Sequence, residues 1–174
     1  MLEYFKGAKG SWMWVIIRLW LGYNWVQAGW HKLSGATPFD ASGFIKGGIA
    51  GSVPAKPGAK PTIQPWWGNF LKNFALPNTG LFNFLVMYGE ILVGLALLVG
   101  FATIFAASMG FLMNFAFVMS GSISTSPVYM ILQFVLVLGG AYAGYIGVDY
   151  WFRPMYRNFV AGLFGGEKTV KSAA

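Results

Sequence analysis

Long apolar stretches separated by short polar links dominate the chain, and four of them are long enough to cross a membrane. They cover residues 12–30, 81–100, 103–119 and 128–147. A helix needs about 20 apolar residues to cross a hydrocarbon core of about 30 Å. The links at 100–102 and 120–127 are short, so the helices that they join are antiparallel neighbours. The pattern predicts an all-α integral membrane protein whose four transmembrane helices form a compact bundle.

The connection between the first two stretches, residues 32–78, differs from the other links in length and composition. It carries six prolines, at positions 38, 54, 57, 61, 65 and 77. Connections of this length in a compact domain are usually functional. After Pro65, five apolar side chains recur at helical spacing: Trp66, Trp67, Phe70, Leu71 and Phe74. They predict a short amphipathic helix that rests in the membrane interface, packs as a cap over the mouth of the bundle, or does both.

Composition supports a single membrane domain over residues 1–174, with a polar tail at 149–174. Hydrophobic residues make up 56% of the chain and charged residues 10%, against about 25% charged in an average soluble domain. The net charge of +7 indicates topology control and contact with anionic lipid. Nucleic-acid binding would need a soluble basic face, which the pattern lacks. The basic N-terminus resembles a signal peptide, but Arg18 and several tryptophans predict that the first helix is retained.

The distribution of lysine and arginine indicates the orientation. Basic residues are dense beside the helix ends at both termini, at positions 6, 9, 153, 157, 168 and 171. Those of the long connection are spread more thinly, at positions 32, 46, 56, 60 and 72. The bias predicts that both termini are cytoplasmic and that the long connection lies outside.

Cysteine is absent and His31 is the only histidine. These counts exclude disulfides, iron–sulfur clusters, covalent haem and a multi-histidine metal site within one chain. We therefore predict neither a metal site nor a covalently bound cofactor. His31 lies at the end of the first predicted helix, where we expect it to be solvated.

Three of the polar residues inside the apolar stretches matter most: Arg18, Glu90 and Asn114. Such groups are costly in lipid and usually face the bundle interior, so each is a candidate functional residue. Counted from the cytoplasmic side at about 1.5 Å per residue, their depths are about 10, 15 and 18 Å. We expect Arg18 and Glu90 to meet, with Asn114 beside them. The cluster is either an ion pair that fixes helix register, or a pocket in which Glu90 exchanges a proton and Arg18 holds an anion or a carbonyl oxygen.

Small residues favour close helix packing. Ala102, Ala106, Gly110 and Asn114 recur every four residues in the third predicted helix. The fourth carries its own run at positions 139, 140, 143, 144 and 147. Small residues at this spacing let helix backbones approach one another. Three further side chains in the fourth predicted helix offer hydrogen-bonding groups: Gln133, Tyr142 and Tyr145.

Several short motifs, in this order, resemble DoxX-type membrane proteins. They are Leu19-Trp20-Leu21-Gly22, Ala28-Gly29-Trp30-His31-Lys32-Leu33, Gly89-Glu90-Ile91-Leu92-Val93-Gly94, Met113-Asn114-Phe115 and Ala143-Gly144-Tyr145-Ile146-Gly147-Val148-Asp149. The resemblance covers residues 12–154. The long first connection with its Pro-Trp segment is similar to the branch near DoxD, the larger subunit of thiosulfate:quinone oxidoreductase. The resemblance implies a four-helix subunit of a bacterial or archaeal plasma membrane, linked to quinone or redox chemistry. We do not expect a self-sufficient thiosulfate oxidoreductase, because such an enzyme needs a second domain in its partner subunit, and we find no domain of that kind in this sequence.

The expected function is that of a membrane subunit in a quinone-linked oxidoreductase or respiratory complex. Glu90 and Arg18 are the candidate catalytic residues, and with Asn114 they form the candidate pocket for a quinone, the expected cofactor. The expected partners are the lipid bilayer and other membrane subunits of a redox complex. The alternative is a non-catalytic accessory subunit that stabilises such a complex. A small-solute carrier is a weaker alternative, because the chain has neither an inverted repeat nor a pair of broken helices.

Overall fold

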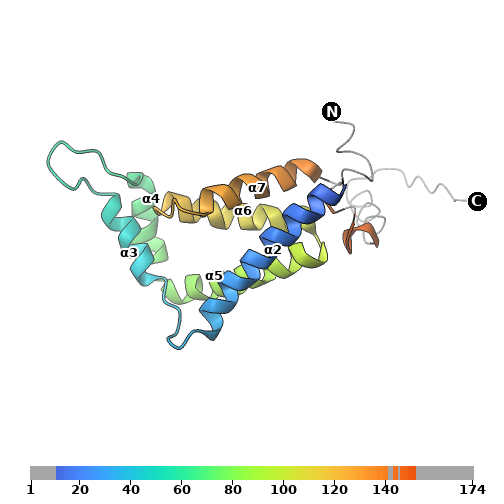
Figure 1. The fold of residues 1–174 in the computed structure, drawn as a ribbon. Helices are drawn as coiled ribbons and strands as arrows, with labels where there is room; N and C mark the ends of the chain where they lie inside the picture. Colours follow the sequence, from blue (N-terminus) through green and yellow to red (C-terminus); the bar gives the residue numbers. More distant parts are fainter. Residues whose placement is uncertain (1–10, 141–142, 145, 152–174) are drawn as a thin grey trace, which may run out of the picture.

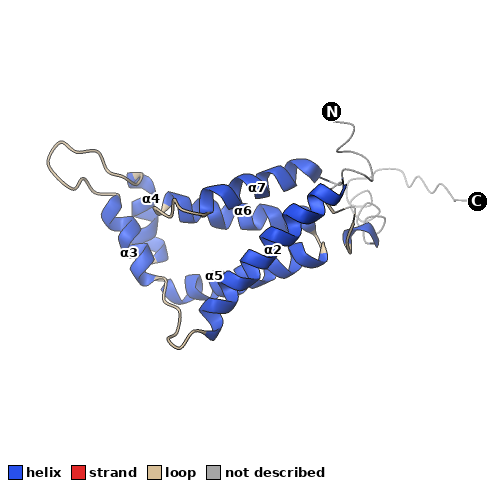
Figure 2. Cartoon of the chain, viewed as in Figure 1, coloured by secondary structure: helices blue, strands red, loops and turns tan. Residues whose placement is uncertain are grey.

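The computed structural model describes residues 11–140, 143–144 and 146–151, and every regular element in this part of the chain is helical (Figure 2). The elements are α2 (Ser11–Ser34), α3 (Ser42–Gly51), α4 (Pro65–Phe70), the π-helical turn η1 (Leu71–Ala75), α5 (Thr79–Val99), α6 (Thr103–Met119) and α7 (Ser126–Gly139). The predicted all-α class is thus confirmed for the described residues.

The four long helices contact one another in a ring. α2 packs against α5, α5 against α6, α6 against α7, and α7 returns to α2. Leu21, Leu97 and Leu136 meet in the core of this ring with no exposed surface, beside the nearly buried Trp25. α3, α4 and η1 form a cap (residues 36–78) at the end where α2 stops and α5 starts, and residues 146–151 lie at the opposite end (Figure 1).

The closest helix pair is α2 and α5, which touch through their backbones. A Cβ added to Gly94 would lie 2.6 Å from the Val26 nitrogen and 2.8 Å from the Gly22 oxygen. A Cβ added to Gly29 would lie 2.9 Å from the Met87 oxygen. A Cβ added to Gly22 would lie 2.9 Å from the Gly94 oxygen. All three glycines are therefore required by contact distance, as at other close helix crossings.

One described helix, α5, is both long and apolar enough to span a membrane. It has 21 residues and a mean hydropathy of 2.0. α6 and α7 are apolar but have only 17 and 14 residues. α2 has 24 residues, but its apolar sequence is interrupted by Arg18, His31 and Lys32. The arrangement of four membrane-spanning helices therefore stays a prediction, to which α5 gives the most support.

The fourth predicted helix, at 128–147, is shorter than expected. α7 begins at Ser126, with Pro127 in its first turn as predicted, but it ends at Gly139. Gly140 adopts φ +53°, a conformation that glycine reaches without the penalty of a Cβ. The chain then turns back, and the Val148 and Asp149 amides donate to the Val99 and Gly100 oxygens at 3.2 and 2.8 Å. The glycines after position 139 thus serve a turn rather than a helix face.

Arg18 fastens this returning segment to α2, and Asp149 fastens it to the start of α6. Arg18 donates to the Ala143 and Ile146 oxygens at 3.2 and 2.6 Å. The Asp149 carboxylate accepts from the Ala102 and Thr103 amides at 2.5 and 2.8 Å, and so caps the N-terminus of α6. We call Arg18, residues 143, 144 and 146–149, and residues 100–103 the terminal clasp.

Much of the long connection is helical. The predicted helix after Pro65 is confirmed as α4 and η1, whereas α3 was not predicted, because its four glycines give a poor helix signal. The Trp67 indole donates to the Ser120 hydroxyl at 2.9 Å and so attaches the cap to the end of α6. Trp66 and Phe74 point outward and are exposed. The predicted packing of this helix as a cap over the end of the bundle is thus confirmed, while its contact with the membrane interface stays a prediction.

We expect Gly94→Ala to destabilise the fold although alanine favours a helix. The added methyl group meets backbone atoms that cannot rotate away, and overpacking of this kind costs about 1–3 kcal/mol. Gly80→Ala is the matched control on the same helix, because its added Cβ has nothing within 4 Å. Thermal unfolding in detergent, followed by circular dichroism, should show a lower midpoint for Gly94→Ala only. Equal midpoints would contradict the close contact.

We expect Asp149→Ala to weaken the attachment between α6 and the returning segment. The Ala102 and Thr103 amides would lose their acceptor, and loss of a helix cap costs about 0.5–2 kcal/mol. Lys60→Ala is the control, because that side chain lies exposed in the loop between α3 and α4. Thermal midpoints of the two variants test the clasp, and an unchanged midpoint for Asp149→Ala would argue against it.

Candidate functional site

Glu90 is a buried carboxylate near the middle of the most apolar helix. It lies eleven residues after the start of α5 and is 2% exposed. Its neighbours on α5 are valine, methionine, isoleucine and glycine, whose side chains offer no hydrogen bond. A carboxylate in such surroundings needs a partner, because an isolated buried charge is strongly unfavourable.

That partner is Lys32, at the last turn of α2. The Lys32 ammonium lies 2.6 Å from Glu90 Oε2, and the two form an ion pair. Lys32 also approaches the Ala28 oxygen at 3.4 Å and lies 5.6 Å from the centre of the Phe39 ring. Its side chain is 26% exposed, against 3% for Glu90. The pair thus connects a buried carboxylate to the surface.

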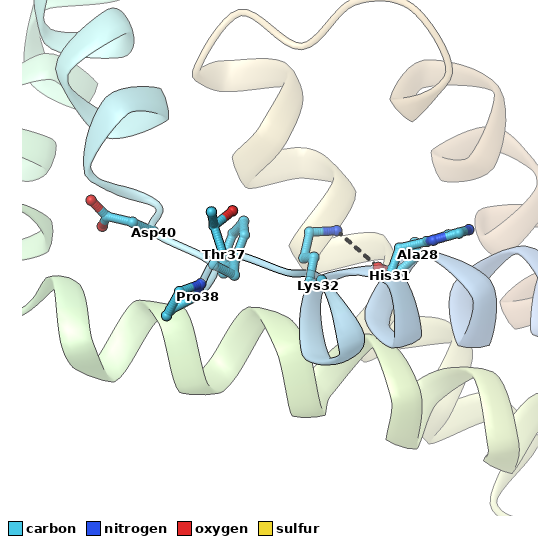
Figure 3. A pocket seen from close by; sticks show the side chains of 8 residues that line it. Ala28, His31, Lys32, Thr37, Pro38 and Asp40 are labelled. Carbon is cyan, nitrogen blue, oxygen red and sulfur yellow. Dashed lines mark hydrogen bonds between the residues drawn. The ribbon is translucent and has the colours of Figure 1, made fainter.

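An open hollow of about 510 Å³ adjoins the exposed side of this pair. It is lined by Ala28, His31, Lys32, Gly35, Thr37, Pro38, Phe39 and Asp40. Figure 3 shows Lys32 between His31 and the segment that leads to Asp40, with these two side chains at opposite ends. His31 is exposed, as predicted. The hollow therefore offers two nitrogen groups, an aromatic wall and, behind Lys32, a carboxylate.

Asp40 at the rim of the hollow is committed to the start of α3. The Ser42 hydroxyl and amide donate to its two oxygens at 2.5 and 2.9 Å. These bonds favour the charged form and hold the pKa of Asp40 below its usual value. Asp40 therefore adds a fixed negative charge rather than an exchangeable proton.

The predicted pair between Arg18 and Glu90 is wrong, although both side chains are buried as expected, at 3% and 2% exposed. Side chains in a helix point back toward its N-terminus. Arg18 therefore reaches away from Glu90 into the terminal clasp, whereas Lys32 reaches back along α2 to Glu90. The depths assigned from the sequence ignored this direction.

Asn114 is buried as predicted, at 2% exposed, but it belongs to a different contact. Its Nδ2 donates to Gln133 Oε1 at 2.8 Å, which joins α6 to α7. Gln133 Nε2 occupies the space left by the missing side chain of Gly110. The small face of α6 therefore accommodates an amide, in agreement with the predicted close packing. Tyr142 and Tyr145, the other hydrogen-bonding candidates of the fourth helix, lie outside the described residues.

Lys32 was not predicted as a site residue, because the sequence placed it in the long connection rather than in the first helix. Its signal was its spacing from Arg18, because 14 residues are almost four helical turns and place both side chains on one face. The second omission was Asp149, whose role in the clasp depends on a chain reversal that the apolar pattern concealed.

The comparisons with known proteins bear on the stretch that holds this site. A DoxX family model matches residues 13–122, which run from α2 through α6 and include Lys32 and Glu90. The comparisons with curated proteins and with solved structures gave no match. The family match covers well over half of the 174 residues. The chain therefore belongs to the DoxX family and is a membrane protein of that type.

Proposed function

We propose that this chain is the quinone-reactive membrane subunit of an oxidoreductase complex. The observation that carries the proposal is the ion pair between Glu90 and Lys32, which links a carboxylate inside an apolar helix to an open hollow. Quinone reduction needs a hydrogen-bond donor to a ring carbonyl and a proton delivered in a low-dielectric site. Lys32 and His31 supply donors, and Glu90 supplies the proton.

The hollow suits the head group of such a molecule. Phe39 offers a ring face, and Lys32 Nζ lies 5.6 Å above it. The exposed apolar side chains of α5 beyond Glu90, which include Leu92 and Leu95, would run beside an isoprenoid tail in lipid. The net change is that one quinone takes up two electrons and two protons to give a quinol. A redox group on a partner subunit, such as a flavin or haem, would supply the electrons.

The proposal includes a membrane arrangement in which α2, α5, α6 and α7 all cross the bilayer. η1 ends four residues before α5 begins, and Phe74 contacts Phe82 at 6.1 Å between ring centres. The exposed aromatic side chains of the cap would therefore lie at the level where α5 enters the membrane, as in an aromatic belt. The hollow beside Lys32 would open at the same interface.

We expect Glu90→Gln to abolish most quinone reduction by the purified complex. Removal of a proton-transferring group typically lowers turnover by about 10²–10⁴-fold, while the isosteric amide keeps the shape of the site. Lys32→Met should raise KM for quinone, because a donor is lost from the hollow. Lys72→Met, on the exposed face of η1, is the matched control and should leave both constants unchanged. Unchanged turnover in Glu90→Gln would remove this carboxylate from the mechanism and favour an accessory role for the chain.

We expect the cap to lie outside the cell and the termini inside. The chain has no cysteine, so single introduced cysteines report on topology without a background. A membrane-impermeant maleimide should label Lys56→Cys in intact cells, because that residue lies in the exposed loop of the cap. Lys171→Cys should be labelled only after permeabilisation. The opposite pattern would invert the proposed orientation.

A further inference from the structure

The two ends of the helical core are closed in different ways. At the cap end, Glu90 reaches the surface through a single side chain, Lys32, which is 26% exposed and lines the open hollow. At the clasp end, the Arg18 guanidinium fills the space beside Gly100 and Gly147. The route from Glu90 to water is therefore short in one direction only.

A layer of leucines lies between Glu90 and the terminal clasp. Ten residues separate Glu90 from Gly100 along α5, which is about 15 Å of helix. Within that distance Leu97 of α5 belongs to one core cluster with Leu21 of α2 and Leu136 of α7, and each has no exposed surface. Side chains buried in this way pack as closely as in other protein interiors, which leaves no room for a chain of water molecules.

The unpartnered polar atoms beside this layer do not offer a path for a proton. Trp25 Nε1 and Gln133 Nε2 are buried beside the leucines without a hydrogen-bond partner, and the other two such atoms, Arg18 Nε and Thr103 Oγ1, belong to the clasp beyond them. The two atoms beside the leucines are N–H donors without a lone pair that accepts a proton at neutral pH. A buried donor that neither accepts nor releases a proton cannot relay one.

The charged groups around Glu90 are unequally distributed between the two directions. Lys32 and His31 of α2 and Asp40 of the cap lie on the side of the hollow. α6 and α7 face the interior with the amides Asn114 and Gln133, which do not titrate. The phenol of Tyr129 on α7 donates to Asn24 of α2 at 3.1 Å and is engaged there. Arg18 and Asp149 lie beyond the leucines and are engaged with backbone groups of the clasp.

We propose that Glu90 exchanges its proton with the cap side of the membrane alone, and that Leu21, Leu97 and Leu136 block exchange with the clasp side. The inference rests on the proposed function only for the use of that proton. Under that function, the two protons taken up for each quinone reduced would all come from the cap side. The site would therefore fix the side of the membrane from which protons are consumed, whatever the side of the electron donor.

The test uses the full chain in liposomes, without quinone or partner. Labelling of Lys56→Cys with an impermeant maleimide gives the fraction of chains whose cap faces outward. The external pH is then changed while a trapped impermeant buffer holds the internal pH. Infrared difference spectroscopy reads the carboxylic acid band of Glu90, which is assigned by its loss in Glu90→Gln. A protonophore added at the end gives the full amplitude of the band.

The amplitude before the protonophore, divided by the full amplitude, should equal the labelled fraction. A ratio of one whatever the labelled fraction would overturn the proposal, and so would a ratio equal to the unlabelled fraction. A band that responds to neither pH would overturn it as well, because Glu90 would then not exchange at all.

Variants of the leucine layer give a second, independent measurement. Leu97→Asn should admit water and raise the ratio to one, and Leu136→Asn should do the same from α7 if the first variant does not fold. Leu92→Asn, on the outer face of α5 with 65% of its side chain exposed, is the control and should leave the ratio unchanged. An unchanged ratio in both layer variants would show that the leucines are not the barrier.

The outcomes separate this inference from the proposed function. If Glu90 exchanges with both sides and Glu90→Gln loses turnover as expected, the proposed quinone site is supported and one-sided proton exchange is contradicted. If exchange is one-sided but Glu90→Gln keeps full turnover, one-sided exchange is supported and the role of Glu90 in quinone reduction is contradicted.

Discussion

The contact between the backbones of α2 and α5 is the constraint on which the rest of this structure depends. Gly22 and Gly94 contact each other directly because neither has a side chain, and Gly29 contacts the carbonyl of Met87. Contacts at backbone distance cannot slide by one residue without a clash, so they fix the register of the two helices. That register places Lys32 within reach of Glu90 and places Arg18 beside Gly100. The chemistry at both ends of the protein follows from it.

The two buried charges of this helix pair are stabilised in different ways. Glu90 is neutralised by the ammonium of Lys32, whose side chain is 26% exposed and lines the open hollow. Arg18 is held by two backbone carbonyls, to which a planar guanidinium with several donors is well suited. Removing one partner of a buried pair costs about 3–5 kcal/mol, because the remaining charge has no compensation. The first arrangement suits exchange with solvent, and the second suits permanent closure.

The terminal clasp shows how a strained position is maintained. Ala102 adopts φ +46°, which is unfavourable for a residue with a Cβ. Its amide and that of Thr103 are both bound by the Asp149 carboxylate, which arrives from the other end of the sequence. Local turn chemistry alone would favour glycine at position 102. The long-range carboxylate compensates for that preference and makes the corner between α5 and α6 depend on the returning chain.

The sequence by itself determined the helical class, the positions of α5 and α6 to within two residues, and the burial of Arg18, Glu90 and Asn114. Those features follow from local composition, because apolar runs, Gly100 and the penalty for a charge in lipid act on each segment separately. Only the tertiary structure decided that α7 ends at Gly139, that Glu90 pairs with Lys32, and that Asn114 binds Gln133. Each of these depends on the offset between two helices and on the direction of a side chain along its own helix. A count of residues along one segment contains neither quantity, and so the burial of each group was predictable while its partner was not.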